Sequence, residues 1–191
     1  MMQKNYLNYL ISKSRKFAKK YKIFDIILYG SAVKGKLEPR DIDILIILEN
    51  EDLDKRDLSY EFKNILKEKI KEVDIKTIKL SEFFDSKFLA RQGVLIEGYS
   101  LVDKVSLSGK FGFDGFTLFT YDLKNLDHNK KTQFVYALLG RKGQGLIKKL
   151  NAVKLSRGAF LIPIENSNIF EDFLDNWKIN YVKKKTLVSK L

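Results

Sequence analysis

The sequence contains no cysteine, one histidine, one tryptophan and only two prolines among its 191 residues. The lack of cysteine excludes disulfides, thiolate metal sites and a cysteine nucleophile. No apolar run at the start is long enough for a signal peptide, and none elsewhere reaches the length of a membrane span. We therefore expect a cytoplasmic protein with no membrane partner.

Acidic residues are fewer than basic ones, 24 Asp and Glu against 36 Lys and Arg, which gives a net charge of +12. Residues 1–105 hold 21 basic and 17 acidic residues, a net of +4, whereas residues 106–191 hold 15 and 7, a net of +8. A basic surface favours polyanions, above all nucleic acid. Because 30 of the 36 are lysines, a genome-wide bias in composition explains the charge equally well.

Apolar residues make up 45% of the chain and follow clear periodic patterns, so the sequence predicts a folded protein. The first part predicts helices over about 6–21, 57–71 and 81–91, and strands over 24–29, 42–48 and 73–80. Strand 42–48 is apolar on both faces, which is typical of a central strand.

The composition changes near residues 104–114, where a glycine-rich segment begins; seven of the 11 glycines follow residue 105. We expect a domain boundary there, with domains at 1–105 and 106–191. The second part predicts strands over 116–123, 159–164 and 181–188 and helices over 130–139 and 169–177, a small α+β domain. Its basic glycine-rich loop, 140–145, suits either a phosphate contact or a plain connection.

The segment from Leu28 to Leu48 carries the strongest functional signal. Asp41 and Asp43 are two residues apart at the start of a strand, so their side chains project on the same side. Paired carboxylates form a hard-oxygen site suited to Mg²⁺. Upstream, the Gly30-Ser31 turn exposes backbone N–H groups that can hold a phosphate, and Lys34 lies near enough to help neutralise it.

Asp74 lies at the start of the third predicted strand and supplies a third carboxylate. If strands 42–48 and 73–80 are neighbours, Asp74 reaches the same cluster as Asp41 and Asp43. Three acids can hold two Mg²⁺ ions about 3.5–4 Å apart, one near the attacking hydroxyl and one at the leaving pyrophosphate. Asp74 then serves as a ligand or as a base.

Gly30-Ser31, nine intervening residues, Asp41-Ile42-Asp43 and then Val73-Asp74-Ile75 resemble the signature of the DNA polymerase β-like nucleotidyltransferase superfamily. Residues 1–105 are most similar to its minimal nucleotidyltransferases. The resemblance implies an α/β fold, a mixed sheet flanked by helices. It also implies transfer of a nucleoside monophosphate from ATP or another NTP, with two Mg²⁺ ions. Gly30 and Ser31 would bind the donor phosphates, and the three aspartates would be catalytic and hold the metals.

The acceptor is left open by the sequence, with RNA or a protein as candidates. Residues 106–191 would present that acceptor or bind RNA.

Arg40 departs from the family pattern, because many members have a small residue before the first aspartate. The alternatives are therefore a non-catalytic RNA- or ribonucleoprotein-binding module on a nucleotidyltransferase scaffold, or the antitoxin of a toxin–antitoxin pair, which would require a partner protein.

Overall fold

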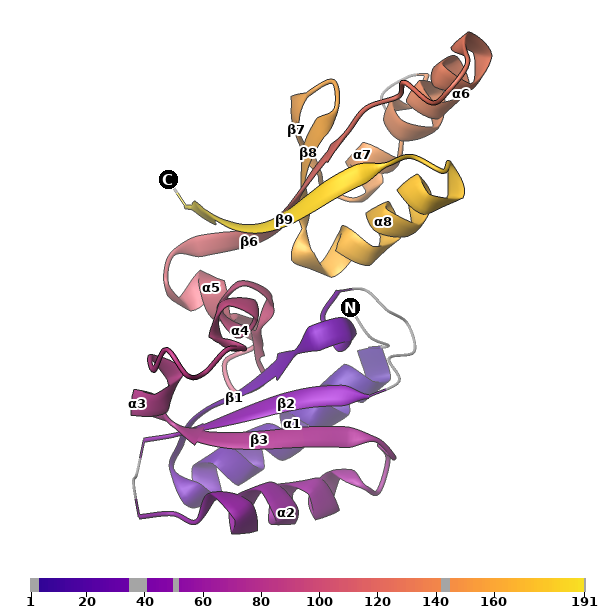
Figure 1. Ribbon diagram of the computed structural model, residues 1–191. Helices are drawn as coiled ribbons and strands as arrows, with labels where there is room; N and C mark the ends of the chain where they lie inside the picture. The colour runs from indigo at the N-terminus through magenta and orange to yellow at the C-terminus, as the bar shows by residue number, and fades with distance from the viewer. Residues whose placement is uncertain (1–3, 35–40, 50–51, 142–144, 191) are drawn as a thin grey trace.

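The computed structural model describes residues 4–34, 41–49, 52–141 and 145–190 and contains two β-sheets with helices packed on them (Figure 1). The first sheet has the strand order β3-β2-β1-β4-β5 and the second β7-β8-β6-β9. The predicted fold class, a mixed sheet with flanking helices followed by a small α+β part, is confirmed. In the described residues no helix is both long and apolar enough to cross a membrane.

The first sheet contains both parallel and antiparallel neighbours. Its strands are β1 (Ile23–Tyr29), β2 (Ile42–Leu48), β3 (Val73–Lys79), β4 (Tyr99–Ser100) and β5 (Val105–Ser106). β1 pairs antiparallel with β2 and with β4, whereas β2 pairs parallel with β3. The parallel crossover passes through α2 (Lys55–Leu66), whose N-cap Asp54 accepts from two backbone N–H groups of the first turn.

Both faces of this sheet are covered, which explains why β2 is almost continuously apolar. Ile44 and Ile46 belong to the core cluster formed with α1 (Lys4–Tyr21) and α2. Leu45 and Ile47 belong to the cluster on the opposite face. That second face is covered by α3 (Leu80–Phe83), α4 (Arg91–Glu97) and α5 (Leu107–Lys110). The short 3₁₀ helix η1 (Gly30–Ala32) follows β1.

The second sheet is antiparallel throughout and packs around an aromatic core. Its strands are β6 (Phe113–Tyr121), β7 (Val153–Ser156), β8 (Ala159–Pro163) and β9 (Tyr181–Ser189). The helices are α6 (His128–Leu139), α7 (Leu146–Lys149) and α8 (Ser167–Asn176), with the 3₁₀ helix η2 (Ile164–Asn166) before α8. Phe119, Phe134, Phe160 and Phe170 are fully buried at the centre.

The predicted continuous helix over 81–91 is wrong. The chain forms α3, then a turn in which the Asp85 side chain accepts from the N–H of Lys87, and α4 begins only at Arg91. Phe83 and Phe88 both pack into the core of the α4 face. Five helical residues would turn these two side chains about 140° apart, so the intervening turn is needed to bury both. The sequence did not predict β7, because this strand is short and exposed throughout and therefore shows no alternation of apolar and polar residues.

Candidate active site

Strand register brings the predicted acids to one place on the first sheet. Asp43 of β2 lies opposite Asp74 of β3 and opposite Tyr29 of β1. Residues paired in this way project from the same face of a sheet. Asp41 lies two residues before Asp43, immediately ahead of β2, so strand periodicity directs it to the same side. This is the face that α4 covers.

The electrostatics of Asp43 indicate that the three carboxylates influence one another. Burial raises the pKa of Asp43, and the charges of Asp41 and Asp74 raise that pKa further, while Lys34 lowers it. Burial, together with Asp43 and Asp74, also raises the pKa of Tyr29. Asp41 and Asp74 are exposed and Asp43 is half-buried, so the cluster opens to solvent.

The carboxylates are neighbours without converging on a single point. In the part of the chain that the structure describes, no three acidic, cysteine or histidine side chains form a ready-made ligand group for one ion. Like charges favour separation of the side chains, and a divalent cation between them would remove that repulsion. The donor chemistry, three carboxylates with one of them half-buried, fits Mg²⁺.

Gly30 brings the turn after β1 directly against Asp43. Its φ is +75°, a conformation that side-chain-bearing residues rarely adopt. A Cβ built on Gly30 would lie 2.2 Å from Oδ2 of Asp43. Glycine is therefore required both for the backbone conformation and for the space that Asp43 occupies. Ser31 follows in η1, and its carbonyl accepts from the N–H of Lys34 at 3.3 Å. The predicted phosphate turn and the predicted metal acids are therefore adjacent.

Lys34 is held by a buried carboxylate that sequence reasoning missed. Its Nζ lies 3.1 Å from Oε2 of Glu97, which is at the end of α4 and only 5% exposed. The other oxygen of Glu97 lies 2.7 Å from Nζ of Lys185 on β9. Glu97 thus joins the turn after β1 to the second sheet. Its sequence position, just before Gly98, carried no signal of this role.

A cleft of about 670 Å³ lies beside the acids on the α4 side. Tyr29, the residue opposite Asp43, lines it together with Gly93, Glu97, Lys184 and Lys185. Two lysines from the second sheet therefore face a space that adjoins the first sheet. Such a cleft favours a phosphate-bearing ligand.

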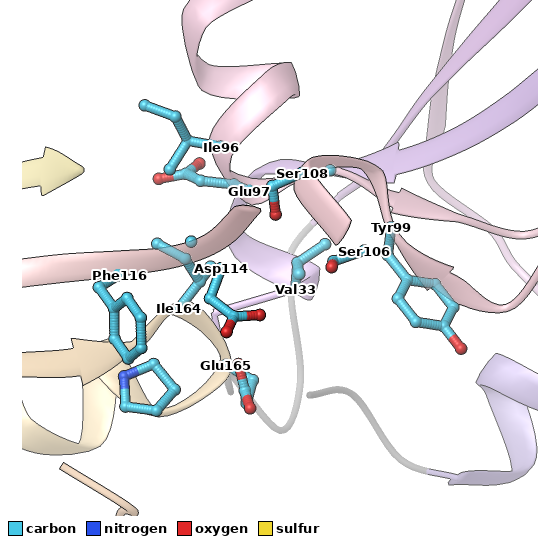
Figure 2. Close-up of a pocket in the computed structure, with 13 residues that line it drawn as sticks. Val33, Ile96, Glu97, Tyr99, Ser106, Ser108, Asp114, Phe116, Ile164 and Glu165 are labelled. Carbon is cyan, nitrogen blue, oxygen red and sulfur yellow. The ribbon is translucent and has the colours of Figure 1, made fainter. Parts of the chain in front are cut away.

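A second cavity, of about 480 Å³, lies between the two sheets next to Val33, close to the turn (Figure 2). The side chains of Ser108, Asp114 and Glu165 are drawn around it. The Ser108 hydroxyl is buried and has no hydrogen-bond partner among the described residues. Residues of both parts of the chain therefore line a cavity next to the turn.

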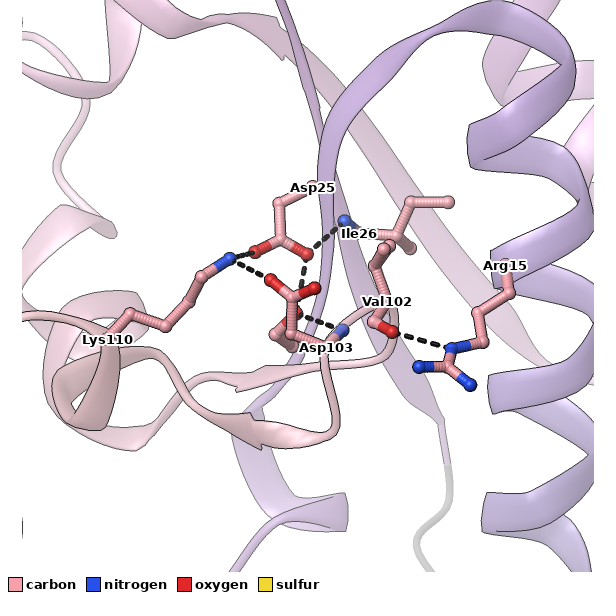
Figure 3. Close-up of polar contacts among 7 residues, drawn as sticks. Arg15, Asp25, Ile26, Val102, Asp103 and Lys110 are labelled. Atoms are coloured by element: carbon pink, nitrogen blue, oxygen red, sulfur yellow. Dashed lines mark hydrogen bonds and ion pairs between the residues drawn. The ribbon is translucent and has the colours of Figure 1, made fainter.

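Asp25 lies in β1, the strand that leads to the Gly30 turn. It is fully buried in β1, where the N–H of Ile26 and the hydroxyl of Ser100 donate to its Oδ1 at 2.8 and 2.7 Å (Figure 3). Nζ of Lys110 lies 2.6 Å from its Oδ2 and 2.5 Å from Oδ2 of Asp103. All of its polar atoms serve this network, which fastens α5 to β1, so Asp25 has a structural role.

Residues 12–101, 90 of the 191, match the family model described as polymerase beta nucleotidyltransferase. The match spans Gly30, Ser31, Lys34 and all three aspartates. A search of curated proteins finds no significant match. Arg40 and the centre of the loop 140–145 lie outside the described residues, so the expectations for them remain predictions.

Proposed function

On the premise that residues 12–101 form a nucleotidyltransferase domain of the polymerase β type, we propose that the protein is an active, Mg²⁺-dependent nucleotidyltransferase. It would transfer a nucleoside monophosphate from an NTP, with ATP expected, to an acceptor hydroxyl. The observation that carries the proposal is the alignment of the Gly30 turn, Asp43 and Asp74 side by side across three neighbouring strands.

The donor phosphates would lie at the Gly30-Ser31 turn, where backbone N–H groups can donate to their oxygens. Lys34, Lys184 and Lys185 supply positive charge around the adjoining cleft. The acceptor oxygen would attack the α-phosphorus, the bond from that phosphorus to the bridging oxygen of the β-phosphate would break, and pyrophosphate would leave. The acceptor proton would pass to Asp74 or to solvent.

Asp41, Asp43 and Asp74 would hold the Mg²⁺. When bound, the metal supplies positive charge that lowers the pKa of the attacking hydroxyl and stabilises the pyrophosphate leaving group. Asp43 is well suited to this role because it lies between the turn and Asp74, and because its neighbours already disfavour its charge in the absence of a cation.

Incubation with an α-labelled NTP, Mg²⁺ and total cellular RNA or protein tests the proposal. We expect the wild-type protein to transfer label and the Asp43→Asn variant to lose at least about 100-fold in rate. Asp172→Asn, the same change at an exposed position of α8, is the matched control and should retain full activity. Equal labelling by wild type and Asp43→Asn would refute the proposal.

A further inference from the structure

An apolar groove of about 370 Å³ lies between α3 and α4 on one side and the ribbon of β6 and β9 on the other (Figure 1). Its polar lining residues are Arg91 and Gln92 of α4. The other lining residues are four phenylalanines and two leucines: Phe83, Phe84, Leu95, Phe111, Phe113 and Leu187. The acids, the Gly30 turn and the lysines of the candidate active site are not among them, so the groove is a separate feature of the surface.

Strand pairing explains why this part of the ribbon is uncovered. Phe113 pairs with Ser189, and Gly115 pairs with Leu187. Phe113, Gly115 and Leu187 therefore project from one face of the ribbon. α4 crosses that face at Gly115, where a Cβ would lie 2.4 Å from the carbonyl oxygen of Ile96. The groove thus opens on the face of the ribbon beside this crossing, and an occupant would insert side chains there instead of adding a strand at the edge.

Two aromatic rings of the groove are largely exposed to solvent. Phe84 is 69% exposed and Phe111 is 54% exposed, whereas Phe83, next to Phe84 in the chain, is buried. Large apolar side chains that gather around a groove mark an interaction site, while single scattered ones need no explanation. Nucleic acid does not suit the groove, because six of its eight lining residues offer no polar group to a phosphate or a base edge.

The charges around the groove are mostly positive. Three segments form it, residues 83–95, 110–113 and 185–190. They contain five lysine and arginine residues and one acid, Asp85. The three lysines of the second and third segments pair with carboxylates. Lys87 and Arg91 of the first segment have no carboxylate partner among the residues that the structure describes, so they leave positive charge beside Phe84.

This charge argues against a second copy of the chain as the occupant. A two-fold dimer through the groove would bring Lys87 and Arg91 of one copy near those of the other, in a chain with a net charge of +12. A lipid surface would reach the exposed ring of Phe84 but not Leu95 and Leu187 within the groove. An inserted side chain of a protein segment would contact all three.

We propose that the groove is the docking site for a partner protein, which inserts the apolar face of an acidic amphipathic helix. Leucine or phenylalanine side chains of that helix would lie against Phe84, Phe111 and Leu187. Its acidic residues would lie near Lys87 and Arg91, which supplies the charge complementarity. Docking here does not depend on nucleotidyl transfer and can be measured without any reaction.

Fluorescence anisotropy with the full chain and a labelled peptide of about 16 residues tests the groove. The peptide carries leucines at positions i, i+3, i+4 and i+7 of a helix and glutamates on the opposite face. We expect Phe84→Ala and Phe111→Ala each to raise its Kd about 10-fold. Tyr60→Ala removes a comparably exposed ring on α2 and should bind as the wild type does. A peptide with lysines in place of the glutamates should not bind.

The proposal is overturned if the wild type does not bind the acidic peptide, if Phe84→Ala and Phe111→Ala bind it as the wild type does, or if the lysine peptide binds equally well. A dimer in sedimentation experiments that both substitutions dissociate would assign the groove to a second copy instead. Binding to vesicles of phosphatidylcholine and phosphatidylserine that both substitutions abolish, without peptide binding, would assign it to a membrane. Asp43→Asn should bind the peptide normally, which separates this inference from the proposed function.

Discussion

At the scale of single residues, Gly30 shows how a small residue can place two functional groups next to each other. Its positive φ starts η1, and the missing side chain leaves room for the Asp43 carboxylate. Gly112 provides a matched comparison, because its φ is +79° but a Cβ there would meet nothing within 4 Å. Both glycines have a positive φ, whereas only at Gly30 does another side chain, that of Asp43, approach the backbone closely.

We expect Gly112→Ala to lower the free energy of unfolding by about 1 kcal/mol, the cost of the left-handed conformation alone. Gly30→Ala should cost more and should also reduce nucleotidyl transfer strongly, because its Cβ displaces Asp43 or the turn. Urea unfolding and the labelling assay measure the two effects. Equal loss of stability in the two variants, with transfer intact in both, would contradict this interpretation of Gly30.

We expect the charge of Asp43 to lower the free energy of unfolding of the metal-free protein. Its pKa is raised in the folded protein, so the unfolded chain loses this proton at lower pH than the folded chain. The ionised side chain therefore destabilises the metal-free fold once the pH exceeds the ordinary pKa of aspartate, and the penalty is complete above the raised pKa. Below both values the penalty is absent.

We therefore expect Asp43→Asn to have a higher Tm than the wild type in EDTA at pH 7, with a smaller difference at about pH 3.5. Addition of MgCl₂ should raise the Tm of the wild type and leave that of Asp43→Asn nearly unchanged. Differential scanning fluorimetry measures both, with Asp172→Asn as the control. A lower Tm for Asp43→Asn in EDTA would show that Asp43 stabilises the fold instead.

At the scale of elements, the network around Asp25 joins β1 to α5, two elements that are distant from each other in the sequence. Arg15 of α1 adds a further tie, since its Nε donates to the carbonyl of Val102 at 2.7 Å (Figure 3). Lys110 is the only cation drawn against the Asp25 carboxylate, and Asp25 is fully buried. A buried carboxylate that loses its cation is costly, whereas loss of both partners is far less so.

Lys110→Met is expected to destabilise the fold by about 3 kcal/mol, because it leaves the Asp25 charge buried without its cation. The double variant Asp25→Asn, Lys110→Met should recover a large part of that loss. Lys87→Met, at an exposed position, should be close to neutral. Chemical denaturation of the four proteins measures these differences, and a double variant less stable than Lys110→Met would disprove the proposed pairing.

At the scale of the whole molecule, the two sheets meet through α4. Ile164 of η2 belongs to the core cluster of the first sheet, and a Cβ on Gly115 of β6 would lie 2.4 Å from the carbonyl oxygen of Ile96. Glu97 adds an electrostatic link, because Lys34 and Lys185 share its carboxylate. The second sheet is therefore held against the candidate active site, with its lysines facing the cleft.

Glu97→Gln should loosen this link and cost about 2 kcal/mol, since it removes a buried acceptor from two cations. We expect faster hydrogen exchange at the β9 amides near Lys185 and a higher KM for the NTP, because Lys34 and Lys185 lose their fixed positions. Glu165→Gln, an exposed change nearby, is the control. Unchanged exchange at β9 in Glu97→Gln would argue against a coupling of the two sheets through this carboxylate.

The sequence alone determined those features that depend on local periodicity and turn chemistry. Alternation and apolar runs predicted β1, β2 and β3 to within about one residue, and the two-residue spacing placed Asp41 and Asp43 on one side of β2. The Gly30-Ser31 turn, with Lys34 nearby, was identified from residue type and order. The family match over residues 12–101 agrees with that interpretation.

Only the tertiary structure decided which of these features meet. The parallel pairing of β2 with β3 places Asp74 beside Asp43, and the reach of β9 brings Lys185 to Glu97. It also buried the Asp25 carboxylate against Ser100 and Lys110, residues 75 and 85 positions further along the chain. These contacts join residues tens of positions apart, and their formation depends on strand order and on packing between sheets, which no local pattern records.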